Sequence, residues 1–272
     1  MTETRLIGWA IGTGIAAARD RLAAVLLRVG VRPNTLTLVG ILLTTAAGVC
    51  YAVGAGGRFG WSLRPSDPAN AYLLAAGIVL LLSSACDMLD GAVARLGRQS
   101  TELGAFLDST LDRYGDFVVY AAIAVYYAAA TPANVTFVLL CLLAIFNGFM
   151  ISYTRARSEG LSRPCTVGYW QRGERWAAIL IATFAYNVPA LVVQQALLPA
   201  LTVIRRILHT QAIIEGKTLI TDPRQGGWWL KIRLWRWPRM TLPYDFVTGL
   251  NIAWLIFARF HPADPLGQWL RP

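Results

Sequence analysis

The sequence predicts an all-α integral membrane protein: six transmembrane helices, preceded by an N-terminal amphipathic interfacial helix and followed by a C-terminal extension rich in Trp and Arg. The first observation is composition, since 56% of the 272 residues are hydrophobic. The second is that apolar runs of about 20 residues recur, which is the length that crosses a bilayer core. The third is that short segments containing Pro, Gly or Arg separate these runs.

Residues 1–32 are predicted to form a juxtamembrane segment. From about Ile7 to Gly30, arginines alternate with Ala, Leu and Val, which is typical of a helix that lies in the plane of the interface with its basic face toward the headgroups. Pro33 ends this helix, because proline cannot continue a helix interior, and we expect Asn34 or Thr35 to cap the next one.

Residues 33–209 are predicted to form the membrane domain, with spans at about 35–54, 70–94, 104–130, 135–158, 173–187 and 189–209. Six spans place both ends of the domain on one side of the membrane. Most of the arginines near span ends fall on that side, whereas Arg58 and Arg64 fall on the other. By the positive-inside rule the arginine-rich side is cytoplasmic, so we expect a multi-pass protein of the cell (inner) membrane.

Residues 210–272 differ in character and are predicted to be an interfacial, membrane-associated extension. The stretch GGWWLKIRLWRWPRM mixes Trp with Lys and Arg, as membrane interfaces favour. The stretch FVTGLNIAWLIFARF is apolar but short for a full span. A re-entrant segment, an interfacial helix and a tilted seventh span all remain open for it.

Four aspartates stand at the ends of two adjacent predicted spans. Asp87 and Asp90 are three residues apart, and Asp108 and Asp112 are four apart, so each pair shares one helix face. A short turn over residues 97–101 brings the pairs together. An ionised Asp within a bilayer costs about 2.5–3.5 kcal/mol, and converging carboxylates repel one another. Divalent cations relieve both costs, and carboxylate oxygens suit Mg²⁺, Mn²⁺ or Ca²⁺. We therefore predict a site for two ions, with Mg²⁺ or Mn²⁺ as the expected metal.

Two neighbouring residues fit a phosphate ligand. Gly91 leaves room for a phosphate to approach the backbone, and the planar guanidinium of Arg95 can neutralise a diphosphate. The alternatives are structural: Gly91 permits close helix packing, and the aspartates form solvated ion pairs with nearby arginines. A cation transporter is a further alternative, although transporters favour sites at mid-membrane between internal repeats, and no repeat is visible here.

These residues complete a longer pattern, D-x2-D-G-x2-A-R-x8-G-x3-D-x3-D. Its fixed positions are Asp87, Asp90, Gly91, Ala94, Arg95, Gly104, Asp108 and Asp112. The pattern resembles the signature of the CDP-alcohol phosphotransferases at every position, and the likeness covers roughly residues 30–209. Members of that family use two divalent cations to transfer a phosphatidyl-type group from a CDP-linked donor to an alcohol, with release of CMP.

The resemblance implies a role for each matching residue. It implies that Asp87, Asp90, Asp108 and Asp112 bind the metal ions and that Asp112 is also the general base for the acceptor hydroxyl. It further implies donor contacts that involve the nucleotide and the diphosphate, made by Asn34, Thr37, Gly91, Arg95 and Thr101. A plain helix cap is an equal alternative for Asn34. Asp116 continues the same helix face, and we favour a structural or supporting role for it.

Two later stretches, SYTRARSEG and VGYWQRGERW, bear on the acceptor. They resemble the bacterial phosphatidylinositol-phosphate synthases and their archaeal counterparts, which implies CDP-diacylglycerol as donor and inositol 1-phosphate as acceptor. The residues implied to hold the acceptor phosphate are Arg155, Arg172, Arg175 and Arg206. Gly173 departs from this resemblance, because proline is common there, and so does the long C-terminal tail. The alternative for each arginine is that it belongs only to the excess of positive charge usual on the cytoplasmic side of a membrane protein.

The remaining expectations concern partners. The runner-up acceptors are glycerol 3-phosphate, serine and free inositol, and the donor lipid is either an ester or an ether. The family resemblance implies a homodimer, and no nucleic-acid partner is expected. The four cysteines form no CxxC pair, so neither a disulfide framework nor a zinc site is predicted.

Overall fold

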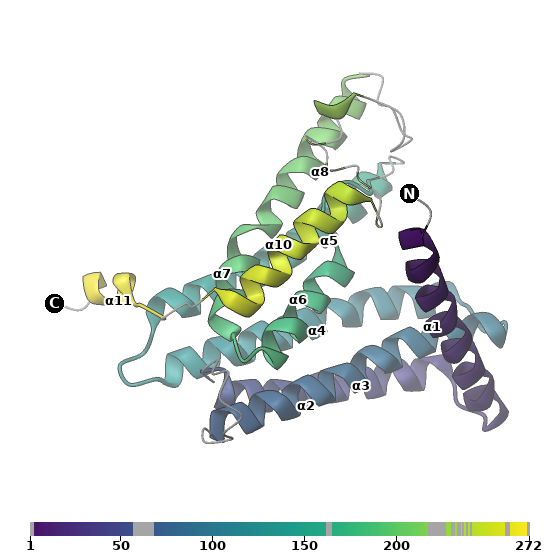
Figure 1. Ribbon diagram of the computed structural model, residues 1–272, viewed down its shortest axis with the longest axis horizontal. Helices are drawn as coiled ribbons and strands as arrows, with labels where there is room; N and C mark the ends of the chain where they lie inside the picture. The colour runs from purple at the N-terminus through teal and green to yellow at the C-terminus, as the bar shows by residue number, and fades with distance from the viewer. Residues whose placement is uncertain are drawn as a thin grey trace. The chain divides into compact units, whose positions relative to one another are not determined.

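The computed structural model describes residues 3–56, 68–161, 165–216, 227–229, 232, 235, 237, 239, 241–258 and 262–270. The chain divides into two compact units, residues 1–49 with 75–119 and residues 50–74 with 120–272. The helices are α1 (Glu3–Arg28), α2 (Pro33–Gly54), α3 (Pro68–Leu96), α4 (Glu102–Ala129), α5 (Val135–Gly160), α6 (Arg172–Phe184), α7 (Val188–Leu197), α8 (Pro199–Ile214), α10 (Leu242–Phe257) and α11 (Pro265–Leu270) (Figure 1).

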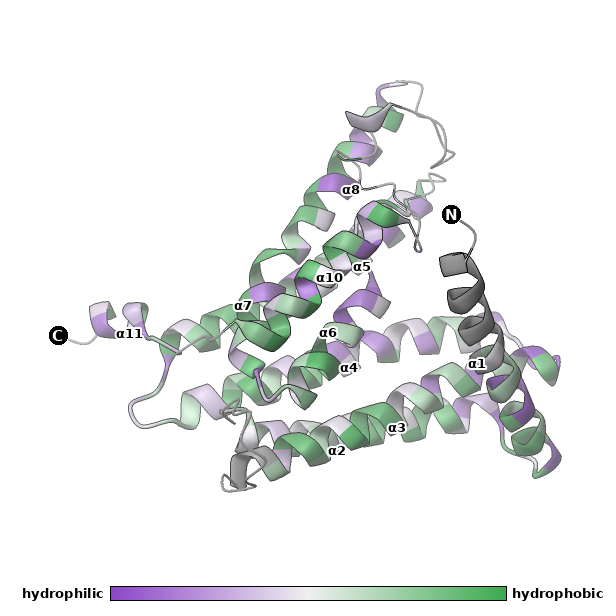
Figure 2. Cartoon of the chain, in the orientation of Figure 1, coloured by the Kyte–Doolittle hydropathy of each residue, from purple (hydrophilic) through white to green (hydrophobic). Residues whose placement is uncertain are grey.

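The described residues form helices and no strands, which confirms the all-α prediction. Four stretches are long and apolar enough to cross a membrane: 33–54, 71–96, 135–160 and 188–214, the last comprising α7 and α8. Figure 2 shows the hydrophobic residues along α2 and α3. Because α4 and α6 do not meet the same criteria, the count of six spans stays a prediction. Arg58 and Arg64 lie outside the described residues, as do Arg163 and much of the Trp- and Arg-rich stretch.

In the first unit, a tight turn joins α1 to α2. Gly30 has a φ of +80°, and the amides of Gly30 and Val31 donate to the carbonyls of Leu27 and Leu26. This is the Schellman motif, which needs a residue of left-handed conformation just after the helix and so favours glycine. The turn holds α1 against a small buried cluster formed by Ala23, Leu36, Leu89, Ala92 and Val93.

The start of α2 corrects one sequence prediction. The helix begins at Pro33, so neither Asn34 nor Thr35 is its cap, since both lie inside the first turn. Proline is favoured at the first helical position because the amide it lacks has no partner within the helix there. Asn34 is exposed and Thr37 is partly buried, one turn further along the same helix.

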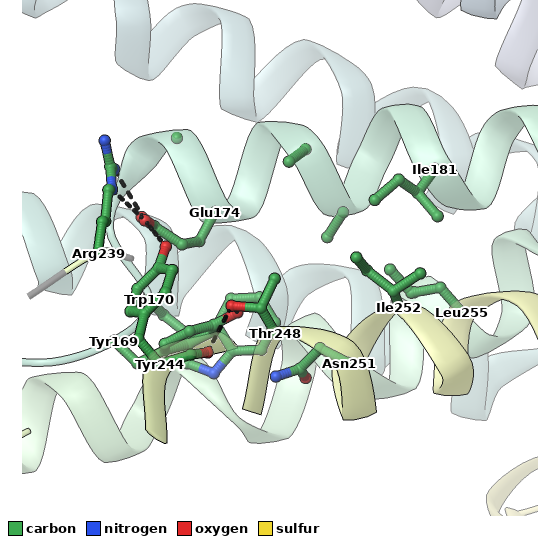
Figure 3. Close-up of a pocket in the computed structure, with 13 residues that line it drawn as sticks. Tyr169, Trp170, Glu174, Ile181, Arg239, Tyr244, Thr248, Asn251, Ile252 and Leu255 are labelled. Carbon is green, nitrogen blue, oxygen red and sulfur yellow. Dashed lines mark hydrogen bonds and ion pairs between the residues drawn. The ribbon is translucent and has the colours of Figure 1, made fainter. Parts of the chain in front are cut away.

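In the second unit, α5 packs against α7 and α8, and α10 packs against α6 and α7 (Figure 1). Two side chains at and in α7 donate hydrogen bonds to the C-terminal extension. The Asn187 amide donates to the carbonyls of Leu255 and Ala258, and the Gln194 amide donates to the Asn251 side chain at 2.9 Å. A buried amide needs such partners, so these contacts tie the extension to the core. A cavity of about 310 Å³ remains between α6 and α10 (Figure 3).

Asp264, the residue before the last described helix α11, caps the start of α5. One carboxylate oxygen of Asp264 accepts hydrogen bonds from the amide and hydroxyl of Thr136 at 2.9 and 2.8 Å, and from the Gly267 amide at 3.0 Å. These donors, led by the Thr136 amide, hold the pKa of Asp264 below its usual value. The Asn134 side chain caps the same end of α5 through the Phe137 amide. The extension therefore supplies one of the caps at the N-terminus of α5.

Replacing Asp264 with Asn should lower the melting temperature at pH 7 by a few degrees, because the anionic acceptor at two helix N-termini is lost. Since the folded pKa of Asp264 is depressed, its stabilisation is present above the unfolded value of about 3.9 and disappears as the pH falls through the folded value. The difference from wild type should therefore shrink in acid. Thermal unfolding followed by Trp fluorescence measures this, with Asp20→Asn as control. An equal loss at every pH would contradict it.

Candidate functional site

The turn between α3 and α4 sets the geometry of the first unit. The amides of Arg98 and Gln99 donate to the carbonyls of Arg95 and Ala94, and Arg98 takes a φ of +51°, so α3 ends in a second Schellman motif. Thr101 then caps α4, because its hydroxyl oxygen accepts from the Gly104 amide at 3.0 Å. The turn occupies residues 97–101, as the sequence predicted.

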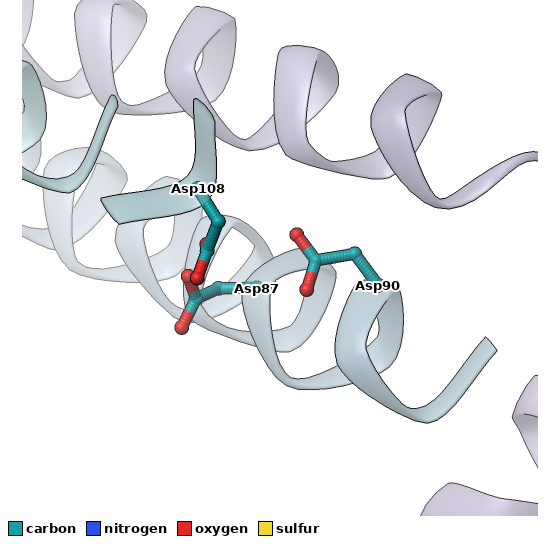
Figure 4. Close-up of side chains that lie close together, drawn as sticks. All are labelled: Asp87, Asp90 and Asp108. Atoms are coloured by element: carbon teal, nitrogen blue, oxygen red, sulfur yellow. The ribbon is translucent and has the colours of Figure 1, made fainter. Parts of the chain in front are cut away.

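This turn brings three aspartates together. Asp87 and Asp90 on α3 and Asp108 on α4 each offer a carboxylate oxygen, and these oxygens all lie within 4.8 Å of one another. Figure 4 shows the three carboxylates directed toward a common point. Asp90 is 7% exposed, and the other two are partly buried. Three like charges this close repel unless a cation or protons compensate them.

The donor set fits a hard divalent cation. Oxygen ligands lie about 2.0–2.6 Å from Mg²⁺ or Ca²⁺, so two oxygens on opposite sides of one ion stand about 4.0–5.2 Å apart. All three oxygens lie within 4.8 Å of one another, so they are close enough to share one such ion. Carboxylate oxygen is also the ligand type that Mg²⁺ and Mn²⁺ prefer over softer metals.

Asp112, the fourth predicted ligand, is not part of this group of oxygens. It lies one turn further along the face of α4 that carries Asp108, and one of its oxygens is 3.9 Å from the guanidinium of Arg113. Asp116 follows after another turn and is 9% exposed. The structure thus brings together three of the four predicted ligands and leaves the fourth beside them.

Thr37 makes a contact that the sequence did not indicate. Its hydroxyl donates to a carboxylate oxygen of Asp90 at 2.7 Å, across 53 positions of the chain. Hydrogen bonds of this kind fix the orientation of a metal-binding carboxylate. The family resemblance implied that Thr37 contacts the CDP-linked substrate. The structure shows a hydrogen bond from Thr37 to the aspartate cluster.

The other residues predicted to contact the donor lie nearby in the same unit. A Cβ atom on Gly91 would stand 3.2 Å from a guanidinium nitrogen of Arg95, so the arginine lies over the glycine. A Cβ atom on Gly104 would stand 3.0 Å from the Thr101 hydroxyl and 3.8 Å from the Asn34 amide oxygen. Gly91, near the end of α3, therefore lies beside the Arg95 side chain, and Gly104, near the start of α4, lies beside the side chains of Thr101 and Asn34.

The predicted acceptor arginines all belong to the second unit. Arg155 and Arg175 both lie within electrostatic range of Arg206, and so does the carboxylate of Glu159. Arg155 is exposed and pairs with Glu159 at 2.8 Å. Arg172 lies with its guanidinium 5.8 Å from the centre of the Trp176 ring. Such a concentration of positive charge is typical of a site for an anion.

Arg206 is more deeply held than the sequence indicated. It is 2% exposed, and its guanidinium donates to the main-chain carbonyls of Ile151 and Val167. Val167 belongs to the segment that leads into α6. The side chain thus links α8 to α5 and to that segment, a structural task that the positive-inside pattern alone does not reveal.

A known protein family matches most of the chain. The family model described as CDP-alcohol phosphatidyltransferase matches residues 30–214. The archaetidylinositol phosphate synthase of Methanothermobacter thermautotrophicus is 34% identical over 188 residues, which cover 67% of this chain and 84% of that protein.

Two solved structures are similar as well. Both are of the phosphatidylinositol phosphate synthase of Mycobacterium tuberculosis. The structure with CDP-DAG bound is 25% identical with a TM-score of 0.59, and the likeness covers 71% of this chain and 93% of that one. The structure in complex with manganese and citrate is 26% identical with the same TM-score, over 71% and 88% of the two chains.

The aspartate cluster predicts binding of Mn²⁺ by the purified protein. Asp90→Asn removes a ligand charge and should weaken binding by about a hundredfold, and Thr37→Val, which frees the Asp90 carboxylate, by about tenfold. Electron paramagnetic resonance of free Mn²⁺ in a titration measures both, and Asp20→Asn serves as the control carboxylate. Wild-type affinity in the Asp90 variant would show that the cluster does not hold the metal.

Proposed function

This chain belongs to the CDP-alcohol phosphatidyltransferase family and is a transferase, and we propose that it transfers the phosphatidyl group of CDP-diacylglycerol to inositol 1-phosphate, giving phosphatidylinositol phosphate and CMP. The observation that carries the proposal is the convergence of Asp87, Asp90 and Asp108 beside Gly91 and Arg95. Relatives named for inositol phosphate acceptors, and a neighbour with CDP-DAG bound, support the choice of substrates.

On the donor side, we assign the diphosphate and nucleotide to Asn34, Thr37, Gly91, Arg95 and Thr101. Arg95 is exposed, so its guanidinium is accessible to a diphosphate. Thr101 uses its hydroxyl oxygen to cap α4 but keeps its hydroxyl proton for a ligand. The carboxylates would hold Mg²⁺ or Mn²⁺, two ions per site, with Asp112 completing the set.

When bound, such ions neutralise the diphosphate and stabilise the charge that develops on the leaving oxygen. Asp112 accepts the proton of the acceptor hydroxyl as the hydroxyl oxygen attacks the β-phosphorus. One P–O bond forms to the acceptor while the P–O bond to CMP breaks. Thr37 keeps Asp90 oriented throughout, because its hydrogen bond leaves that carboxylate little freedom to rotate.

On the acceptor side, we assign the inositol phosphate group to Arg155, Arg172, Arg175 and Arg206. A planar guanidinium matches a phosphate with two parallel hydrogen bonds, which an acceptor without an anionic group, such as free inositol, cannot receive in the same way. The repulsion of Arg206 by Arg155 and Arg175 would be relieved by a bound phosphate dianion. An acceptor without phosphate leaves that repulsion in place, so free inositol should be a poor substrate.

The remaining assignments concern placement. We propose a multi-pass protein of the cell inner membrane, with the site facing the cytoplasm, because the lipid-linked donor stays in the bilayer while its soluble partners do not. We further propose a homodimer. Its domains would be a juxtamembrane segment (1–32), a six-span transferase domain (33–209) and a membrane-associated extension (210–272).

The proposal predicts CMP release from CDP-diacylglycerol that depends on inositol 1-phosphate and on Mg²⁺ or Mn²⁺. Release should be at least tenfold slower with inositol, glycerol 3-phosphate or serine. Asp112→Asn should reduce kcat by about 10²–10⁴-fold, because a positioned general base contributes that much. Chromatographic assay of CMP in detergent micelles provides the measurement.

The controls separate the two halves of this prediction. CMP release that depends on glycerol 3-phosphate, and that is lost in Asp112→Asn, would support the proposed reaction and contradict the proposed acceptor. An ether-lipid donor, tested in parallel, distinguishes the archaetidyl reaction. Full activity in Asp112→Asn would overturn the assignment of the base.

A further inference from the structure

Glu174 lies between two of the proposed acceptor arginines, Arg172 and Arg175, in the first turn of α6. Its side chain is only 7% exposed, and a buried carboxylate needs compensating partners. One oxygen of Glu174 accepts hydrogen bonds from Nε and Nη2 of Arg239 at 3.0 and 2.8 Å, and from the hydroxyl of Tyr244 at 2.6 Å (Figure 3). Both donors lie beyond residues 30–214, the segment that matches the family.

Gly173 makes room for this contact. A Cβ atom at position 173 would stand 3.2 Å from Nη2 of Arg239, closer than side chains ordinarily approach. A glycine in the first turn of a helix otherwise weakens it. Its presence here fits the close approach of the Arg239 guanidinium to the backbone of α6.

The first turn of α6 is thus held from outside the helix. A Glu at the third helical position usually bonds back to the cap residue, but the Glu174 oxygen described above is engaged by the extension, and the Gln171 side chain makes no capping bond. The segment before α6 is held in the same way: the Tyr169 ring lies 5.4 Å from the Tyr244 ring, and the Tyr169 hydroxyl is 3.0 Å from that of Thr248.

The cavity of about 310 Å³ begins beside these contacts and continues along the apolar sides of α6 and α10, lined by Ala177, Ile181 and Ile252 among others. The cavity therefore leaves unfilled volume beside the contacts through which α6 and α10 pack against each other. If the polar contacts at its end were lost, the first turn of α6 would have space to move, since unfilled volume offers little resistance.

We infer that the C-terminal extension sets the affinity for the acceptor: Arg239 and Tyr244 hold Glu174, and Glu174 positions Arg172 and Arg175 for the acceptor phosphate. Arg239 and Tyr244 are positioning residues in this account. The inference rests on the proposed function, because it takes those two arginines as the acceptor site.

The test is steady-state kinetics of CMP release in the full-length protein, with each substrate varied in turn. Arg239→Gln should raise the KM for inositol 1-phosphate about tenfold, while kcat and the KM for CDP-diacylglycerol stay within about twofold of wild type. Tyr244→Phe, which keeps the ring, should raise the same KM about threefold. Arg239→Lys should restore part of the loss, because it keeps the charge but not the planar fork.

Asp264→Asn is the matched control, because it loosens a contact of the extension that does not touch Glu174. An acceptor KM that is unchanged in both Arg239→Gln and Tyr244→Phe would overturn the inference. So would an equal rise in Asp264→Asn, or a parallel loss in kcat and both KM values, because either result indicates general destabilisation.

Wild-type kinetics separate this inference from the proposed function. If wild type uses another acceptor, the proposed acceptor is wrong, and the same variants are measured with the acceptor that works; a selective rise in its KM supports the inference. If wild type releases CMP with none, the proposed function fails and the inference falls with it.

Discussion

Mutual repulsion among three carboxylates on largely apolar helices is the constraint on which the first unit depends. Asp87, Asp90 and Asp108 offer oxygens within 4.8 Å of one another, and an arrangement of that kind is stable only with positive charge among the oxygens or protons on them. The elements around the cluster serve to keep it in place. The turn between α3 and α4 brings the two helices together. The buried cluster that includes Leu89 and Ala92 packs α3 against α1 and α2. Thr37 orients the carboxylate of Asp90.

The second unit meets the opposite problem, a concentration of positive charge. Arg206 is buried and bonded to main-chain carbonyls, whereas Arg155 pairs with an acid at the surface. Between these extremes, the first turn of α6 carries two arginines around a buried glutamate whose partners come from the extension. The extension is tied to the core near both ends of α10, through Tyr244 and Leu255, and at the start of α5, so it is a part of the helical unit and not an appended tail.

The sequence was sufficient where the geometry is local. The spacing of Asp87 and Asp90, with a turn of five residues before α4, predicted that aspartates of the two helices converge, because helix periodicity and turn length determine it. The exclusion of Asp112 from the group is a tertiary feature that the spacing of four residues from Asp108 does not encode. The bond from Thr37 to Asp90 spans 53 positions and that from Arg239 to Glu174 spans 65. Both depend on tertiary packing, and Arg239 stands in a Trp- and Arg-rich stretch that indicated only an interface.

The most direct test of the central claim is to locate the metal itself. Crystals of the protein grown with Mn²⁺ and measured at the manganese absorption edge would give an anomalous difference map. The account predicts a peak about 2.0–2.6 Å from carboxylate oxygens of Asp87, Asp90 and Asp108. A map with no peak at these carboxylates, or with its strongest peak at other acids, would contradict the claim that this cluster is the cation site of the enzyme.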